Sequence, residues 1–274
     1  MTDLVVRRLL IDLEAPFARR WMGGDAFRSA FFSALSMSFP AGEQYFIDSV
    51  RAGLKQLPEA ERGRFAAEVQ GFVGQEATHR RVHALFNDQL AYQGQRNVVE
   101  QRARRRIERD AHLDPRIHVA ATAATEHFTA VFADWMFEHP EALQGCETRL
   151  ATLWWWHAAE ESEHRATAFD LYQAISGDHR WRVRIFRYIT LVFLADVMRQ
   201  TLRNLWHDGA LLRWSTWRSG WALLMARDGM FRGNVGRWRD YVAADFHPSR
   251  HAGERGLAWL RDNAAAYTVV GHAG

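Results

Sequence analysis

The sequence is short of the residues that form covalent and metal cross-links in small secreted proteins. It has one cysteine, Cys146, in 274 residues. A single cysteine excludes an internal disulfide and any cysteine-rich zinc site, and it is compatible with a reducing compartment. Lysine is almost absent too, because Lys55 is the only one and all other basic residues are arginines.

Long apolar runs are also missing. The best candidate for a membrane span, YITLVFLADVM at residues 188–198, is shorter than the roughly 20 residues that a span requires and contains Asp196. At the N-terminus, acids and arginines interrupt the apolar residues too early for a signal peptide. We therefore expect a soluble, cytoplasmic protein.

The composition is that of a globular protein, with 48% hydrophobic and 24% charged residues. Arginines gather at residues 101–110 and again between residues 181 and 239. Acidic residues follow the first cluster, and no nucleic-acid-binding motif accompanies either one. We interpret the clusters as solvated helix faces and expect no nucleic-acid partner.

Alternating strand patterns are not sustained anywhere, and the chain reads as helical throughout. A loop at Gly23–Gly24 and an N-cap at Asp25 precede a helix that Pro40 and Gly42 interrupt. Further long helical segments are expected at residues 43–57, 58–94, 115–139 and 141–176. We predict one all-α domain over residues 1–274, with a four-helix bundle at about 25–176 and a Trp/Arg-rich helical extension at about 179–248.

Two of these segments carry the same ionisable pair. Glu76 precedes His79 by three residues, and Glu161 precedes His164 by three. Each pair interrupts an apolar stripe of helical period, so both pairs face the expected core. Each unpaired ionisable group in a core costs several kcal/mol of folding free energy. The summed cost of several such groups is on the order of the whole free energy of unfolding of a domain. Such a core needs groups that neutralise them.

A dinuclear metal centre would do so. Ferritin-like bundles take a Glu-x-x-His from each of two helices and one glutamate from each of the other two. The remaining long segments supply Glu43 and Glu126, again on apolar stripes. Carboxylates with imidazoles suit iron and manganese, so we expect Fe/Fe or Mn/Fe. The alternative is a core in which these acids and histidines pair with arginines. The predicted metal ligands are Glu43, Glu76, His79, Glu126, Glu161 and His164.

Three neighbours of this set are ambiguous. His83 and His157 each lie about one turn from a predicted ligand on the same face. They are either further ligands, supporting groups or ordinary hydrogen-bonding histidines. Glu160 competes with Glu161, but the spacing to His164 favours Glu161 as the ligand, which leaves Glu160 to accept a hydrogen bond from a ligand.

The sequence also resembles a known family, the bacterial proteins described as predicted metal-dependent hydrolases. FPAGEQYF (39–46), QEATH (75–79), TEHFTA (125–130), EESEHRATAFD (160–170) and DYVAADFHP (240–248) carry the resemblance, which spans residues 31–248. The last motif keeps Phe246, His247 and Pro248 but replaces the Pro-Gly that usually precedes them in the family. The resemblance implies a metal site and a hydrolytic activity.

The ligand set itself favours a dioxygen-activating oxidase or oxygenase, which acts on a small apolar molecule and uses an electron donor. A dinuclear hydrolase is the alternative that the family implies. An iron-storage protein or ferroxidase ranks last, because the chain is basic and long after the fourth helix.

The extension alternates tryptophan and arginine. Trp206, Trp214, Trp217 and Trp221 are expected to pack on the bundle and line a substrate entrance. Peripheral membrane contact and a homodimer contact are the alternatives.

Overall fold

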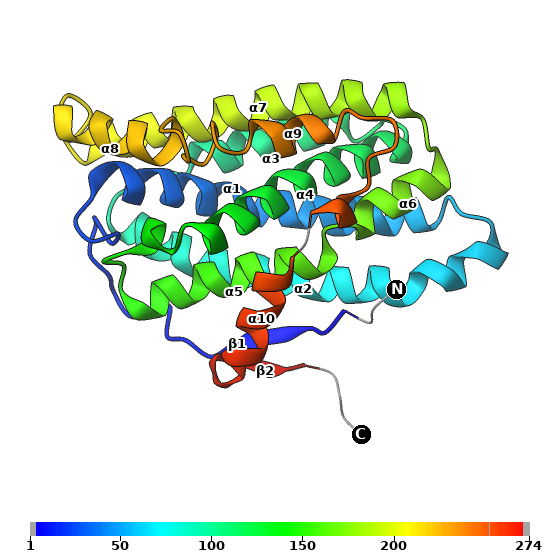
Figure 1. The fold of residues 1–274 in the computed structure, drawn as a ribbon, viewed down its shortest axis with the longest axis horizontal. Helices are drawn as coiled ribbons and strands as arrows, with labels where there is room; N and C mark the ends of the chain where they lie inside the picture. The colour runs from blue at the N-terminus through cyan, green and yellow to red at the C-terminus, as the bar shows by residue number, and fades with distance from the viewer. Residues whose placement is uncertain (1–3, 252, 271–274) are drawn as a thin grey trace.

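The computed structural model describes residues 4–251 and 253–270, and its fold is all-α, as predicted (Figure 1). Four long helices make the centre. α1 packs against α2 and α4, α4 against α5, and α2 against α5. Their bounds are α1 Ala26–Leu54, α2 Glu59–Tyr92, α4 Pro115–Glu138 and α5 Thr148–His164.

The remaining elements surround this bundle. α7 packs against α1 and α4 along much of its length, while α10 crosses α5. No helix among the described residues is long and apolar enough to cross a membrane. The other helices are α3 Val98–Asp110, α6 Thr167–Ile175, α7 His179–His207, α8 Trp214–Leu224, α9 Val235–Asp240 and α10 Glu254–Asp262, with 3-10 turns η1 Pro140–Leu143, η2 Pro248–Arg250 and η3 Ala264–Ala266.

The predicted helix starts have the expected local chemistry. Gly23 and Gly24 turn the chain with φ of 61° and 81°, a region that suits glycine. The Asp25 carboxylate then accepts from the Arg28 amide and caps α1. Asp114 caps α4 in the same manner through the Arg116 amide, with Pro115 in the first helical position.

The predicted interruption at Pro40 and Gly42 is wrong, because α1 runs without a break through both. Proline has no N–H to donate to the carbonyl of Ser36, one turn earlier. That carbonyl instead accepts from the Asn87 side chain of α2, at 2.9 Å. The helix therefore continues, and Glu43 is carried on the same rigid element as the buried residues before it.

The predicted segment 141–176 is not one helix. It begins with η1, and the helical pattern is interrupted at Arg165 and Ala166, directly after His164. Arg165 donates to both carboxylate oxygens of buried Asp134 on α4, at 2.8 and 3.1 Å, and to the His251 carbonyl at 2.7 Å. The interruption thus coincides with a buried ion pair that ties α5 to α4.

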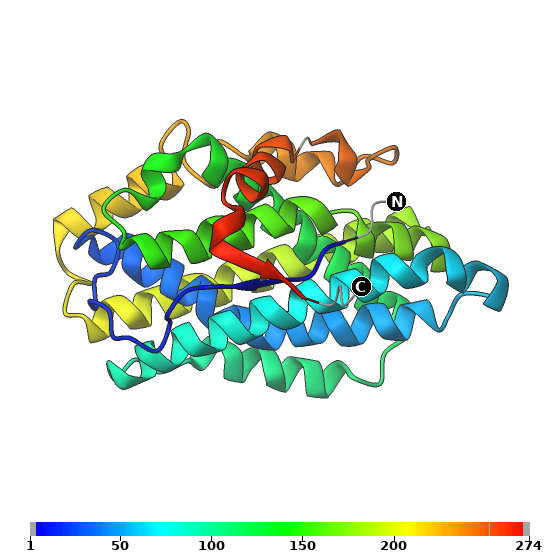
Figure 2. The ribbon, with the colours of Figure 1, turned by 90° about the horizontal axis from the view of Figure 1, so that it is seen from below.

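A short ribbon that the sequence did not predict joins the two terminal regions. β1 Arg7–Leu9 pairs antiparallel with β2 Tyr267–Val269, and Arg7 lies opposite Val269. In Figure 2, which views the molecule from below, the ribbon lies in front of α2 and α5. The Arg7 guanidinium lies 5.3 Å from the ring centre of Tyr267. The ribbon therefore fixes the arginine at the surface of the bundle.

Helices α7 and α8 of the Trp/Arg-rich extension pack on α1, but most of its tryptophans differ from their prediction. Trp206, Trp214 and Trp221 are 73%, 80% and 62% exposed rather than packed on the bundle, whereas Trp217 is 39% exposed and its ring centre lies 6.2 Å from that of Phe27. The buried residues of α8 are Thr216, Gly220, Leu223 and Leu224, so the helix turns its small and aliphatic face inward. At Gly220 an added Cβ would lie 2.6 Å from the Phe27 ring, which leaves no room for a larger residue on that face.

The bond between Asn87 and Ser36 gives a stability test. Asn87→Ala is expected to lower the free energy of unfolding by about 1–2 kcal/mol, because it leaves a buried carbonyl without a donor. In a Pro40→Ala background the restored amide supplies that donor, so the same change is expected to cost less. Urea denaturation of the four proteins in this cycle measures the difference. Equal costs in both backgrounds would contradict the role assigned to Asn87.

Candidate metal centre

The six predicted ligands converge inside the bundle. Glu43 comes from α1, Glu126 from α4, and the two Glu-x-x-His pairs from α2 and α5. None of the six is more than 4% exposed. Four helices thus direct four carboxylates and two imidazoles into a space that excludes solvent.

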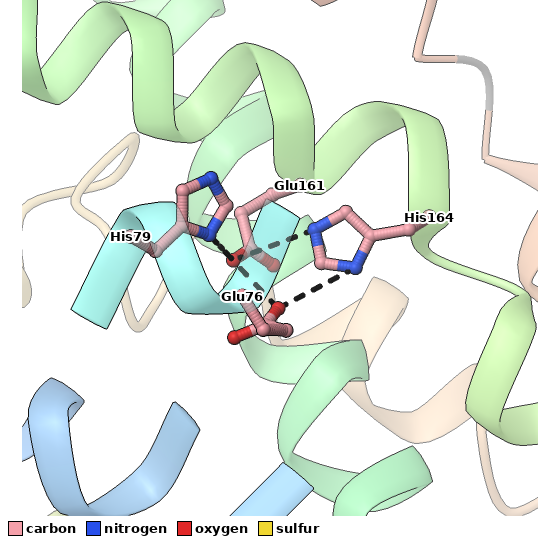
Figure 3. Close-up of side chains that lie close together, drawn as sticks. All are labelled: Glu76, His79, Glu161 and His164. Carbon is pink, nitrogen blue, oxygen red and sulfur yellow. Dashed lines mark ion pairs between the residues drawn. The ribbon is translucent and has the colours of Figure 1, made fainter. Parts of the chain in front are cut away.

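The two Glu-x-x-His pairs form the centre of the cluster (Figure 3). Glu76, His79, Glu161 and His164 each offer one donor atom within 4.8 Å of the others. Glu76 Oε1 lies 3.9 Å from His79 Nδ1 and 3.6 Å from His164 Nδ1. Glu161 Oε1 lies 3.9 Å from His79 Nδ1 and 3.8 Å from His164 Nε2. Each carboxylate therefore lies between the two imidazoles.

The single glutamates lie on either side of this centre. Glu126 Oε2 is 3.1 Å from His164 Nδ1, so Glu126 belongs to the same cluster. Glu43 groups instead with His83 and His157, within the same 4.8 Å limit. The charges of Glu161 and Glu126 nevertheless reach Glu43, where they add to burial in raising its pKa. The structure thus separates Glu43 slightly from the other five.

The cluster contains buried oxygen and nitrogen atoms that have no hydrogen-bond partner in the described part of the protein. Among the described residues, none makes a hydrogen bond to either oxygen of Glu43, Glu76 or Glu126, to Glu161 Oε2, to His79 Nδ1 or to either nitrogen of His164. Buried polar atoms are rarely left in this state, because each costs about 1–3 kcal/mol. Cations are the partners that carboxylate oxygens and neutral imidazole nitrogens share, so these residues fit a metal centre.

The pKa values show the same excess of negative charge. Burial, reinforced by the neighbouring carboxylates, raises the pKa of Glu76 well above its ordinary value and that of Glu126 to about 7. Burial lowers the pKa of His164 and raises that of Glu161, but the neighbouring groups prevail. Glu126 and then Glu161 raise the pKa of His164 to about 9, while His164 and His157 lower that of Glu161. A bound cation would stabilise all four carboxylates as anions.

Glu160 supports the cluster from outside, as its sequence position suggested. Its Oε2 lies 2.9 Å from His79 Nε2, and its Oε1 accepts from Arg7 at 3.1 Å. Arg7 also donates to Glu163, which accepts from Gln75. When Glu160 is ionised, His79 donates from Nε2, and its Nδ1 lone pair faces Glu76 and Glu161. Such an outer carboxylate orients a metal-binding histidine.

His83 and His157 form a hydrogen-bonded chain that ends at the cluster. His157 Nε2 lies 3.0 Å from Glu161 Oε1, and His157 Nδ1 lies 2.7 Å from His83 Nε2. His83 Nδ1 in turn lies 2.9 Å from Ser36 Oγ. The His157 ring also stacks on His79, with 4.2 Å between ring centres. His157 is thus within reach of Glu161, and His157 and His83 are both within reach of Glu43, so both histidines could serve as further ligands.

No pattern in the sequence indicated the role of Arg7. This arginine lies 153 positions from its partner Glu160 in the chain. Its surroundings, in a short N-terminal segment, resemble neither a helix face nor a motif. The pairing of β1 with β2 and the contacts of Val5 and Val6 with α2 place it next to Glu160, so local patterns could not identify it.

Two cavities reach the cluster. One of about 180 Å³ lies between α1, α3, α4 and α7 and extends to Glu43; its lining is mostly apolar and includes Phe46, Ala103, Ile107 and Ile189. A smaller one of about 40 Å³ reaches Glu161 and His157. Both are bordered by Phe39, Thr129 and Phe193. These residues therefore separate two approaches to the cluster.

The Phe246-His247-Pro248 motif lies elsewhere. Phe246 is buried against His127 and Phe169, and His247 Nε2 lies 2.7 Å from the Asp170 carboxylate of α6. The motif thus secures the C-terminal segment to α4 and α6 rather than supplying a group to the cluster.

A family model described as "Predicted metal-dependent hydrolase" matches residues 5–252. The chain belongs to this family. The match covers the bundle, the Trp/Arg-rich extension and Arg7, so the resemblance expected from the five motifs is confirmed. No curated protein and no solved structure matches the chain. The relation to ferritin-like proteins therefore stays a prediction.

The position of Glu76 between two imidazoles gives a test of the centre. Glu76→Gln is expected to lose all stoichiometric metal, because the change removes a charge that both sides of the cluster share. Elemental analysis of the purified variant measures this. Glu61→Gln, an exposed change on the same helix, is the control and is expected to keep the wild-type metal content. Full metal content in Glu76→Gln would contradict the assignment.

A second test asks whether Glu160 positions His79 without itself binding the metal. Glu160→Gln keeps the shape of the side chain but removes the carboxyl group that contacts His79 Nε2. It is expected to weaken metal binding by about 10–100-fold without abolishing it. Competition with a chromophoric chelator measures the affinity. The matched control Glu163→Gln leaves the Glu160–His79 contact intact and is expected to have a smaller effect; the reverse order would count against this role.

Proposed function

We propose that the protein is a hydrolase whose centre is formed by two divalent metal ions. The observation that supports this most is the cluster of unsatisfied carboxylate and imidazole donors in a chain of this family. Glu76 and Glu161, which lie between the imidazoles, are assigned as shared ligands. The remaining proposed ligands are Glu43, His79, Glu126 and His164, with His157 as an alternative.

Two such ions, when bound, lower the pKa of a water and polarise a carbonyl or phosphoryl oxygen. The side chains around them have separate tasks. Glu160 and Arg7 hold the His79 ring in place, so that its Nδ1 faces the cluster. The chain from Glu161 through His157 and His83 offers a proton a hydrogen-bonded route towards Ser36 and the partly exposed Asn87.

The larger cavity supports a small, largely apolar substrate. Its volume of about 180 Å³ is below the usual 300–1,000 Å³ of ligand pockets, which favours a compact molecule. Glu43 is at its inner end, while Arg106, Asp110 and Asp196 supply its charged lining. Since the wall near Glu43 is formed by side chains such as Phe39 and Phe46, we infer that bound substrate excludes water from the centre.

A dioxygen-activating oxidase or oxygenase is the second candidate, with Fe/Fe or Mn/Fe and an external electron donor. Two observations favour it. The donor set has twice as many carboxylates as imidazoles, as in di-iron carboxylate bundles. The cavity of about 40 Å³ beside Glu161 is enclosed largely by apolar side chains, among them Leu35, Phe132 and Met136, and it has room for only a very small molecule.

Metal content and response to dioxygen separate the two candidates. For the hydrolase we expect about two zinc or manganese ions per chain, turnover of small apolar esters or phosphoesters, and no optical change between anaerobic reduction and air. About two iron ions, or one manganese and one iron, with a near-ultraviolet band that responds to air, would favour the oxygenase instead. Absence of stoichiometric metal even after reconstitution would overturn both.

The same assays test the proposed cavity. Ala103→Phe narrows it from α3 without touching any proposed ligand. This variant is expected to keep its metal and to raise KM for the substrate that is found. An unchanged KM would place the substrate elsewhere while leaving the metal centre intact.

A further inference from the structure

The corner between α7 and α8 has the largest exposed side chains of the extension. Leu202 and Trp206 lie near the end of α7, Leu212 in the connecting turn, and Trp214 and Trp221 on α8. Leu212 is 91% exposed, more than any of the three tryptophans of α8. We call these residues, with Met225, the α7–α8 corner. Figure 1 shows α8 at one end of the bundle, beside the end of α7.

The residues of the corner follow helical periods. Leu191, Leu202 and Trp206 recur at intervals of eleven and four along the outer face of α7, while Met198 between them packs partly against the core. On α8, Trp214, Trp221 and Met225 recur at seven and four, with Arg218 on the same face. An outward face of this kind has no partner among the described residues, although large exposed apolar patches usually mark an interaction site.

The charge around the corner is mostly positive. Residues 179–228 contain nine arginines, three aspartates and no glutamate. Asp196 is paired with Arg106 at 2.6 Å and Asp208 with Arg20 at 2.8 Å, while Asp228 is exposed. Arg203, Arg213 and Arg218 are exposed close to the tryptophans in sequence. The partner that fits this surface must therefore be apolar and negatively charged at once.

We propose that the α7–α8 corner docks on the surface of a membrane that contains anionic lipids. Tryptophan and arginine suit this boundary, because indole rings lie among headgroups and guanidinium groups bind phosphates. The helices lie on the bilayer and do not cross it, in keeping with the lack of a spanning helix in the described residues.

Two other partners fit less well. A second copy of the chain would bring the same arginine-rich surface against itself, and like charges repel. A single-stranded nucleic acid would use the tryptophans for stacking, but it leaves no role for exposed aliphatic side chains such as Leu202 and Leu212.

Vesicle sedimentation of the whole protein tests the proposal. Binding is expected with vesicles of phosphatidylcholine and phosphatidylglycerol, with a blue shift of tryptophan fluorescence, and much weaker binding with phosphatidylcholine alone. The triple change Trp206→Ala, Trp214→Ala, Trp221→Ala is expected to weaken binding by about tenfold or more. Arg203→Glu with Arg218→Glu is expected to remove the preference for anionic vesicles.

Trp181→Ala is the matched control. Trp181 is also on α7 and 48% exposed, but it lies 25 residues before Trp206, or roughly 37 Å along the helix. This variant is expected to bind as the wild type does. The proposal is overturned if no vesicle binds, if Trp181→Ala weakens binding as much as the triple change, or if the corner tryptophans instead mediate dimerisation or binding of a single-stranded oligonucleotide. Metal content is not involved in any of these outcomes.

Discussion

The rest of the structure depends on the cost of placing four carboxylates inside a helical bundle. Their charges repel one another in a medium that stabilises charge poorly, and the protein supplies few donors to them. Several features of the fold serve to hold them in place nonetheless. The Asn87 bond lets α1 pass Pro40 and carry Glu43 inward, and the Arg165–Asp134 pair joins α5 to α4 directly beside His164. The bundle is therefore organised around buried carboxylates whose charge a bound cation would offset.

Much of this arrangement could be predicted from the sequence, because it depends on local periodicity. The apolar stripes gave the helices, and the repeated Glu-x-x-His spacing placed two carboxylates and two histidines on inward faces. The cap at Asp25 followed from residue type alone. Whether the six residues bind metal is a separate question, which the geometry makes testable.

The features that could not be predicted depend on partners distant in the chain. Pro40 looks like a helix end until Asn87, on another helix, replaces the missing donor. Arg7 has no local pattern, since its position depends on a strand near the other terminus. The exposure of Trp206, Trp214 and Trp221 was also not predicted, because here the local pattern suggested the wrong face of the helix. An aromatic residue on an amphipathic helix normally faces inward, and only packing shows that α8 turns its smaller side chains to the bundle.

Helix α7 connects the two proposals. Ile189 and Phe193 line the larger cavity, while Leu202 and Trp206 face outward farther along the same helix. If the corner rests on a bilayer, a lipophilic substrate would be concentrated at the surface of the helix that borders its cavity. The two proposals do not require each other, but together they describe an enzyme that takes apolar molecules from a membrane.

The ribbon of β1 and β2 makes the centre sensitive to a long-range contact. Pairing Arg7 with Val269 closes a loop of almost the whole chain, and a two-stranded ribbon is only marginally stable by itself. Arg7 nonetheless influences the position of His79, because it donates a hydrogen bond to Glu160, which in turn contacts His79 Nε2. For a metal ion bound at the cluster, thermodynamic linkage would work in both directions: opening of the ribbon would weaken the hold on the ion, and the ion would favour the closed ribbon. Amide hydrogen exchange in residues 7–9 would thus report on the occupancy of a centre deep inside the bundle.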